Sequence, residues 1–455
     1  MTRRHHFLLL TYPVHSHINP TLQLANHLLT LGACKVTFAT SASACHRITR
    51  QLQHEDLSFV EFPDNFIKAF SADGEEQEDP VKLEIRRSCS DTLARVISTS
   101  CEDGWPITCS VYTPTVPWMI GVVHQLPVPS VLLWTQPAAV LVIYYHFFFG
   151  HRDAIMNLFG QSSSSSSSSI DLPGLPFSLK ACDLPTFMRP VNPHPWAIKL
   201  FDLQTNWIAA QGNHNVLVNT FEPLEPEALK AVKELNMIPI GPLIRKVYND
   251  ELDEKAEGDY VEWLNSKPDA SVVYISFGSI WVLSSEQTEE LSLALLRLGR
   301  PFLWIIRTPQ EEGKDDDVTQ LRCIKELEQL GLIIPWCSQV KVLSHPSVGC
   351  FLTHCGWNST LESLAAGVPM VGIPLWVEQV TNAKLVEEYW KCGVRAGVNE
   401  NDLVEMDEII RCLNLVMGDE ELRRNANKWK ELALKAAAGN GPAYGNLCRF
   451  VNGLG

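Results

Sequence analysis

Short apolar runs alternate with segments of helical periodicity along the whole chain. In the first half, FLLLTY (7–12) precedes a helical pattern over 20–31, and KVTFAT (35–40) precedes another helical segment. SVVYISFGS (271–279) begins a second series, which continues with apolar runs at 301–307, 331–336 and 348–354. Runs of this length that alternate with helices are typical of buried strands in parallel sheets built from βαβ units. Two such series predict an α/β chain with two doubly wound domains.

A polar, acidic stretch separates the two series. GPLIRKVYNDELDEKAEG (241–258) is predicted to be the linker between a first domain, 1–240, and a second domain, 259–438. Eight consecutive serines (162–169) cannot contribute to a core and predict a surface loop, with a phosphorylated or gating loop as the alternative. The acidic run EEGKDDD (311–317) is also expected to be a loop, and metal binding there is the weaker hypothesis.

The composition narrows the class of protein. Of the 455 residues, 45% are hydrophobic and 20% are charged, which is ordinary for a globular protein. A net charge of −15 argues against nucleic acid and anionic membranes as partners. The odd number of cysteines, 13, favours reduced thiols and a cytoplasmic location. The first apolar run ends at Pro13, so no signal peptide is expected. The longest apolar stretch (138–149) is too short to span a bilayer and predicts core or the wall of an apolar pocket.

The residues after the run at 348–354 suggest an anion site. A buried strand is expected to end at Thr353, and the sequence HCGWNST then leads into a helical pattern. Gly356 would let the backbone approach a ligand, and Asn358 and Ser359 are expected to cap the helix. A strand, a glycine turn and a helix start together favour phosphate binding, to which His354 could add a donor. A plain capped turn is the alternative.

The segment 336–379 resembles, over all 44 of its positions, the signature box of plant secondary-product UDP-glycosyltransferases of family 1. SHINP (16–20), VLVNTFEPLEPEAL (216–229) and GPL (241–243) agree in order, and the chain looks most like the branch of anthocyanin 5-O-glucosyltransferases and of hormone or carboxylic acid glucosyltransferases. The resemblance implies the GT-B fold, in which two Rossmann-like domains face each other across a cleft. The first domain would bind the acceptor and the second the UDP-sugar, while the last segment, 439–455, would pack back on the first domain.

The resemblance also implies roles for single residues of the donor site. Trp336 would stack on uracil, beside Cys337, and Gln339 and Glu362 would bind ribose hydroxyls. Glu378, where the family usually has Asp, and Gln379 would bind the sugar, and Gln at this position favours glucose. Thr135 would contact the sugar near the reaction centre. The residues that would surround the diphosphate are Ser279, His354, Gly356, Trp357, Asn358 and Ser359.

Two histidines lie in the first loop, TYPVHSHINP (11–20). The family pattern places the general base on His17, whereas His15 is expected to belong to the loop or the acceptor pocket. Asn19 is expected to cap the following helix with Pro20 as its first residue, so the helix dipole would keep the His17 imidazole neutral. His17 would deprotonate the acceptor, which attacks C1 of glucose with inversion and gives a β-glucoside. The Asp that usually orients this histidine is replaced by Thr113, which carries no charge. Either Thr113 orients the His17 imidazole weakly through a hydrogen bond, or an acidic acceptor compensates for the missing charge, which favours phenols and carboxylic acids.

The acceptor is the least defined part of this interpretation. Trp118, Tyr144 and Phe187, with His15, are candidates for the pocket of a small aromatic acceptor, although a core helix explains the aromatic run 144–149 equally well. Glucose ester formation on a carboxylic acid is one alternative function, and a UDP-sugar-binding protein without catalysis is another. A dinucleotide oxidoreductase is disfavoured because no strand is followed by GxGxxG. UDP-glucose would be a co-substrate, with no metal or other cofactor, and a monomer is expected.

Overall fold

Parallel strands alternate with helices through both halves of the chain. The computed structural model describes residues 4–32, 34–49, 54–66, 80–114, 128–160, 168–192, 195–210, 214–244, 254–279, 282–306 and 323–454. It divides into unit 1, Met1–Ile244 with Lys435–Gly455, and unit 2, Arg245–Leu434. The division at 244 falls inside the stretch expected to be the linker. Trp118, the acidic run 311–317 and most of the serine run lie outside the described residues.

Unit 1 is built on a seven-stranded sheet with the order β3-β2-β1-β4-β5-β8-β9, and every pair is parallel. In register, Phe7 of β1 lies opposite Val36 of β2 and Cys109 of β4. All six residues of β1 are buried, as expected for a strand that is covered on both faces. The strands are β1 (His5–Leu10), β2 (Cys34–Ser41), β3 (Leu57–Phe62), β4 (Cys109–Tyr112), β5 (Ser130–Trp134), β8 (His214–Val218) and β9 (Leu235–Pro239).

Helices connect these strands and close the core of unit 1. Leu24 and Leu28 of α1 pack in one cluster with Phe7 and Leu9. A two-stranded antiparallel ribbon, β6 (Ile170–Asp171) with β7 (Ser178–Leu179), stands apart from the main sheet. The helices are α1 (His15–Thr30), α2 (Ala42–Thr49), α3 (Pro80–Glu102), α5 (Ala138–Phe148), α6 (Arg152–Gly160) and α7 (Pro195–Ala210), with short 3-10 turns at η2 (Ala181–Asp183), η3 (Thr186–Met188) and η4 (Ala228–Lys230).

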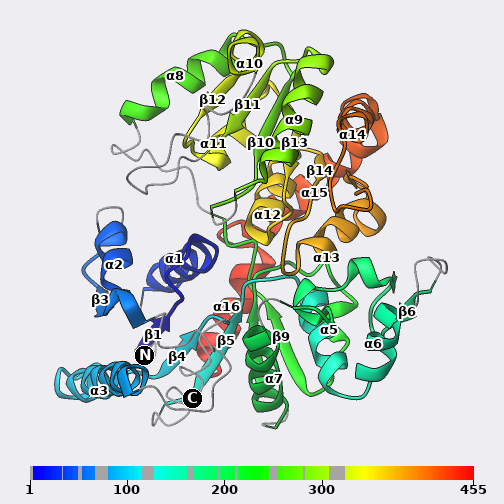
Figure 1. The fold of residues 1–455 in the computed structure, drawn as a ribbon. Coiled ribbons are helices and arrows are strands. Elements are labelled where there is room, and N and C mark those ends of the chain that lie inside the picture. Colours follow the sequence, from blue (N-terminus) through cyan, green and yellow to red (C-terminus); the bar gives the residue numbers. More distant parts are fainter. Residues whose placement is uncertain are drawn as a thin grey trace. The chain divides into compact units, whose positions relative to one another are not determined.

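The last helix of the chain, α16 (Pro442–Asn452), belongs to unit 1. Leu447, Phe450 and Val451 join the same core cluster as the helix α1, and the Asn446 side chain donates to the Pro239 carbonyl (2.7 Å). Figure 1 shows α16, in red, close to β9, in green, although the two are far apart in the sequence. The segment 439–455 that was expected to pack on the first domain lies within the stretch Lys435–Gly455 that groups with it.

Unit 2 repeats the architecture with a six-stranded sheet in the order β12-β11-β10-β13-β14-β15, again with parallel pairs. Its core contains Val273 and Ile275 on one face of β10, packed with Leu291 of α9 and Leu413 of α14. The strands are β10 (Val272–Ser276), β11 (Phe302–Ile305), β12 (Leu332–Ile334), β13 (Val348–Thr353), β14 (Met370–Gly372) and β15 (Gly393–Arg395). The helices are α8 (Glu254–Asn265), α9 (Ser285–Leu298), α10 (Ile324–Leu330), α11 (Gln339–Leu343), α12 (Trp357–Ala366), α13 (Gln379–Lys384), the π-helical turn η6 (Leu385–Tyr389), α14 (Met406–Gly418) and α15 (Glu420–Ala437).

The apolar stretch 138–149 forms the helix α5, in which nine of eleven residues are buried. Among the described helices, none combines the length and the apolar character that crossing a bilayer requires. All thirteen cysteines lie in the described part of the chain, and their thiols are unbridged there.

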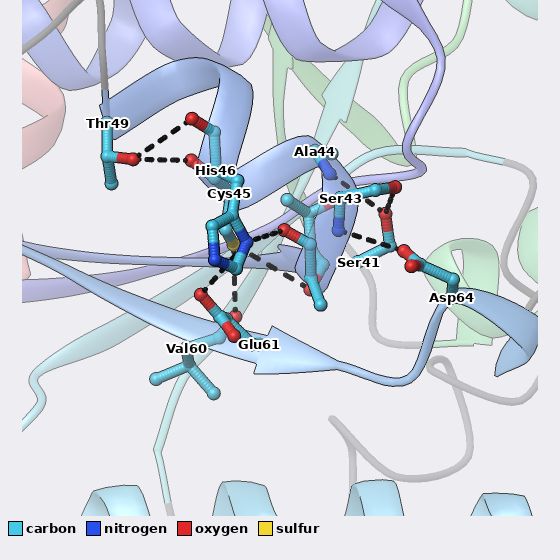
Figure 2. A network of polar contacts seen from close by, with 11 residues as sticks. Ser41, Ser43, Ala44, Cys45, His46, Thr49, Val60, Glu61 and Asp64 are labelled. Atoms are coloured by element: carbon cyan, nitrogen blue, oxygen red, sulfur yellow. Dashed lines mark hydrogen bonds and ion pairs between the residues drawn. The ribbon is translucent and has the colours of Figure 1, made fainter.

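A network of polar contacts fixes α2 between β2 and β3 (Figure 2). The Ser43 amide donates to Asp64 Oδ1 (2.9 Å), and hydrogen bonds from Ser43 lower the pKa of that exposed carboxyl. The His46 imidazole contacts the Ala42 carbonyl (2.7 Å) and lies 3.7 Å from the Glu61 carboxylate. These contacts cap and anchor a surface helix, so we assign them a structural role.

Candidate functional site

In each sheet the strand order reverses at one point, and candidate residues follow the two strands on either side of that point. In unit 1 the order runs outward in opposite directions from β1 and β4, and in unit 2 from β10 and β13. The carboxyl ends of strands at such a switch point are where open α/β sheets bind ligands. His17 follows β1 and Thr113 follows β4, while Ser279 follows β10 and His354 follows β13.

The helix α1 begins earlier than the sequence predicted. Its first residue is His15 and its N-cap is Val14, whose carbonyl accepts the amides of His17 (3.0 Å) and Ile18 (2.9 Å). The prediction that Asn19 caps this helix with Pro20 as its first residue is therefore wrong. Pro20 is tolerated inside the helix because its missing N–H would have bonded within the first turns, where water can solvate the carbonyl that is left over.

His17 lies in the first turn of α1, and its ring is desolvated. Its Nδ1 atom is buried, and the ring meets that of Tyr12 edge-on, with centroids 5.8 Å apart. Burial lowers the pKa of His17 to about 4. The imidazole is consequently neutral at pH 7, as expected, but burial is the cause, rather than the helix dipole alone. His15, two residues earlier, is exposed.

Thr113 is buried at the end of β4, where its hydroxyl is engaged by the backbone. Its Oγ1 accepts the Tyr12 amide (3.3 Å), and its own amide donates to the Leu10 carbonyl (3.1 Å). Among the described contacts, none joins this hydroxyl to the His17 ring. Thr113 therefore ties β4 to the loop that carries Tyr12 and His17, and a direct role in orienting the imidazole stays a prediction.

Thr135 is buried just after β5 and precedes the helix α5. The first amides of α5 donate to a buried carboxylate. Glu225, 2% exposed, accepts the amides of Ala138 (3.0 Å) and Ala139 (2.9 Å) at the start of α5. Its pKa is raised by burial, against which the amide bonds act. The motif at 216–229 does not by itself predict this role for Glu225, because a carboxylate in a loop gives no sign that its partners will be the amides of a helix start 86 and 87 positions away.

The aromatic residues proposed for the acceptor pocket form a packed cluster in unit 1. Tyr144 is fully buried and stacks on Phe201 of α7, with centroids 4.3 Å apart, and Phe187 lies 6.2 Å from the same ring. Trp134 meets both Tyr144 and Phe201 edge-on. The structure thus places Tyr144 in core packing, the alternative considered for the run 144–149, and it packs Phe187 against the same cluster; contact of either residue with an acceptor stays a prediction.

In unit 2, the turn after β13 leads directly into α12. The N-cap is Gly356, and the first helical bond runs from the Thr360 amide to the Gly356 carbonyl (2.9 Å). Asn358 and Ser359 lie inside the first turn, so the prediction that they cap the helix is wrong. The helix starts earlier because Gly356 adopts the extended cap conformation itself. The amides of residues 357–359 precede the first helical bond, which is the arrangement that binds anions.

His354 is enclosed by two glycines at this switch point. A Cβ atom added to Gly278 would lie 2.7 Å from His354 Nε2, and one added to Gly356 would lie 2.5 Å from it. Gly278 also has a φ of +82°, which side chains rarely adopt. Burial lowers the pKa of His354 to about 4, and a hydrogen bond to the Ser276 backbone acts in the opposite direction, so the ring is neutral and its one N–H belongs to that bond. Trp357 packs inward, its ring 5.9 Å from Trp390.

The residues expected to bind the nucleoside are joined by hydrogen bonds. Gln339 Nε2 donates to Ser359 Oγ (2.9 Å) and to Glu362 Oε2 (2.7 Å). Its Oε1 accepts the hydroxyl of Tyr274 (3.1 Å), a residue of β10 that sequence reasoning missed. Trp336 precedes this group and is 39% exposed, whereas its neighbour Cys337 is buried. The structure therefore brings the predicted nucleoside residues together and leaves an indole face accessible.

Glu378 and Gln379 lie at the start of α13 and are both buried. Gln379 Oε1 accepts the amides of Leu375 and Trp376, each at 2.9 Å, so its amide oxygen is occupied and its NH₂ group is the part left to meet a ligand. Burial raises the pKa of Glu378 to about 7, and its backbone hydrogen bond acts in the opposite direction. In the described residues, no three histidine, cysteine or acidic side chains are arranged to hold a metal ion.

Two doubly wound domains with polar residues at both switch points are the architecture of a GT-B glycosyltransferase. A sequence model of the family described as UDP-glucoronosyl and UDP-glucosyl transferase matches residues 236–433. The chain is 45% identical to the phloretin 4'-O-glucosyltransferase of Malus domestica over 99% of its own length and 98% of that protein. It is 40% identical to the anthocyanidin 3-O-glucoside 5-O-glucosyltransferase 1 of Perilla frutescens, over 99% and 98% of the two chains.

Among solved structures, that of Os79 from O. sativa in complex with UDP is similar, with a TM-score of 0.80 and 29% identity over 99% of this chain and all of that one. The chain belongs to the UDP-glucoronosyl and UDP-glucosyl transferase family. It is a UDP-glycosyltransferase, and the resemblance to the anthocyanin 5-O-glucosyltransferase branch is confirmed.

Proposed function

We propose that this enzyme is an inverting glucosyltransferase that moves glucose from UDP-glucose to a hydroxyl of a small phenolic acceptor. The observation that carries the proposal is the placement of His17, a neutral imidazole at the switch point of unit 1. A neutral imidazole can accept a proton, whereas an imidazolium cannot. Two relatives that support this substrate class are named for action on phloretin and on an anthocyanidin 3-O-glucoside.

In the proposed reaction, His17 removes the proton of the acceptor hydroxyl as the oxygen attacks C1 of glucose. The C1–O bond to UDP breaks on the opposite face, so the α-linked donor yields a β-glucoside and UDP. The proposal requires the sugar held by unit 2 to come within reach of His17. Thr113 stands where the family usually has an Asp, and its hydroxyl carries no charge that could offset an imidazolium. An acidic hydroxyl, such as a phenol, needs less help from the base, which favours phenolic acceptors.

The leaving diphosphate would be stabilised by the start of α12, which lies beside His354. Ser279, at the end of β10, lies on the same edge of the sheet and would add a hydroxyl. These donors suit a dianionic leaving group, so we propose that transfer requires no metal ion or other cofactor. Activity that is unchanged in the presence of EDTA would support this part, and activity that is restored only by a divalent cation would contradict it.

The nucleoside and the sugar would bind beside the diphosphate, at the carboxyl ends of the unit 2 strands. The exposed face of Trp336 would stack on uracil, and Gln339 and Glu362 would meet the ribose hydroxyls. Gln379 would donate its NH₂ group to a sugar hydroxyl, while the Glu378 carboxylate would accept from one. The fixed amide oxygen of Gln379 makes this residue a donor only, which restricts the sugar groups it can recognise to acceptor oxygens.

The decisive experiment is an acceptor screen with UDP-glucose over flavonoids, simple phenols and aromatic acids, with UDP release as the readout. We expect turnover with phenols, and NMR of the product should show a β-O-glucosidic linkage. His17→Ala should lower kcat by a factor of about 10²–10⁴ with little change in UDP binding. Ester products would favour the carboxylic acid alternative. UDP-glucose binding without turnover over the whole panel would favour a binding protein.

A further inference from the structure

Two buried tyrosines form hydrogen bonds with the turn that would place Trp336 against uracil. The hydroxyl of Tyr260, on α8, accepts the Ser338 amide (3.3 Å). The hydroxyl of Tyr274, on β10, donates to Gln339 Oε1 (3.1 Å) and lies 3.4 Å from Cys337 Sγ. The side chains of both tyrosines are about 1% exposed. The turn 336–339 therefore rests on buried hydroxyl groups that neither the motif nor the proposed reaction assigns.

Tyr274 is fixed by the sheet itself. It pairs in register with Phe351 of β13, and the two rings stack with centroids 4.8 Å apart and an interplanar angle of 18°. Its neighbours Val273 and Ile275 point to the opposite face and join the core of unit 2. A buried ring that stacks on the ring of the neighbouring central strand can move little, so its hydroxyl keeps a fixed position relative to the sheet.

The hydrogen bonds give the Gln339 amide one orientation. Its oxygen receives the Tyr274 hydroxyl, and its nitrogen donates to Ser359 and to the carboxylate of Glu362. In the flipped amide, the oxygen would face the Glu362 carboxylate, and two acceptors would meet without a proton between them. Without the Tyr274 hydroxyl, the amide oxygen would be left buried and unpaired on that side, and the preference for this orientation would weaken.

We propose that Tyr274 is a positioning residue for the nucleoside end of the UDP-sugar. Through Gln339 it fixes the rotamer of Glu362 on α12 and the turn that carries Trp336, so that the groups for ribose and uracil are arranged before the donor arrives. The inference rests on the proposed donor site in unit 2 and adds a residue to it. Pre-organised groups lose less conformational entropy on binding, so the effect of Tyr274 belongs to donor affinity and not to the chemical step.

Tyr274→Phe tests the proposal because it keeps the stacked ring and removes only the hydroxyl. The Kd for UDP by titration calorimetry and the KM for UDP-glucose should rise about fivefold to tenfold, the loss of one net hydrogen bond. At saturating donor, kcat and the KM for the acceptor should stay within about twofold. Tyr112→Phe removes the hydroxyl of an equally buried tyrosine in unit 1 and should leave both donor constants unchanged.

A double-mutant cycle separates positioning from general stability. If Tyr274 acts through Gln339, then Tyr274→Phe should weaken UDP binding no further in a Gln339→Ala background. Unchanged UDP binding by Tyr274→Phe, or full additivity with Gln339→Ala, would overturn the inference while leaving the donor site intact. Absence of UDP binding by the wild-type enzyme would instead overturn the donor site and this inference together. Should Tyr274→Phe unfold, Tyr274→His gives the same comparison in folded protein, because its shorter ring does not reach the position of the phenol hydroxyl and the Kd for UDP should again rise about fivefold to tenfold.

Discussion

The pH dependence of transfer should reveal how far burial has changed His17. An ordinary imidazole has a pKa of 6.5, and the desolvated ring of His17 has a pKa of about 4. The difference corresponds to about 3 kcal/mol of preference for the neutral form. At pH 5.5, about 97% of such a ring is neutral, against about 9% of an ordinary one. The acid limb of kcat/KM for the acceptor should therefore lie near pH 4, and activity at pH 5.5 should stay close to its plateau.

The assay is initial-rate UDP release between pH 4.5 and 8 at saturating UDP-glucose. The acceptor should be a phenol that does not ionise in this range, so that the enzyme alone titrates. At saturating donor, kcat/KM for the acceptor reports the enzyme–donor complex, so the profile is repeated in Glu378→Gln to exclude the ionisation of this carboxyl. His17→Ala should show a low and flat profile over the same range.

Folding must be followed at each pH, because the same groups affect stability. His17 and His354 have folded-state pKa values lowered from 6.5 to about 4, so the unfolded chain binds protons that the folded chain does not. Stability that is fully present above pH 6.5 is lost as the pH falls towards 4. A reversible fall in kcat/KM with a midpoint at pH 6–7, in enzyme that remains folded by circular dichroism, would refute the assignment of a desolvated base.

The other predictions concern single polar groups. Lowering the pH below about 7 should protonate Glu378 and reduce kcat/KM for UDP-glucose towards the value of Glu378→Gln, whose own profile should be flat there. Thr113→Ala should reduce turnover less than about threefold and lower stability by about 1 kcal/mol in urea denaturation, because its bond goes to the Tyr12 amide; a loss of turnover above a hundredfold would show that it serves His17. Gln379→Glu should keep the loop, since one oxygen can still accept its amides, and raise the KM for UDP-glucose about tenfold without a change in Tm; an unchanged KM would exclude donation to the sugar. Gln204→Met should raise stability by about 1–2 kcal/mol, because neither amide atom of this buried side chain has a partner among the described residues; a lower Tm would contradict this reasoning.

The sequence predicted correctly those features that depend on residues close together in the chain. The buried runs at 7–12 and 348–354 became β1 and β13 because both faces of a central parallel strand are covered, which demands continuous apolar residues. The motif in 336–379 predicted the family and the residues of the donor site, since their order in the chain is itself the signal. Helix starts were less secure: α1 began at His15 and α12 at Trp357, because backbone geometry at Val14 and Gly356 outweighed the capping tendency of Asn19 and Asn358.

The tertiary structure decided how deeply each polar side chain is buried and which partner it bonds. The low pKa of His17 depends on the burial of its ring in the folded chain, which the sequence pattern around it does not specify. Tyr274 and Glu225 acquired their partners across 65 and 87 positions, so their roles were visible only after the sheets had formed. The sequence by itself determined two doubly wound domains and the family, and it predicted the residues of a donor site. Only the fold decided how each side chain is solvated and to which partner it is bonded, because desolvation and long-range hydrogen bonds arise from segments that meet in space.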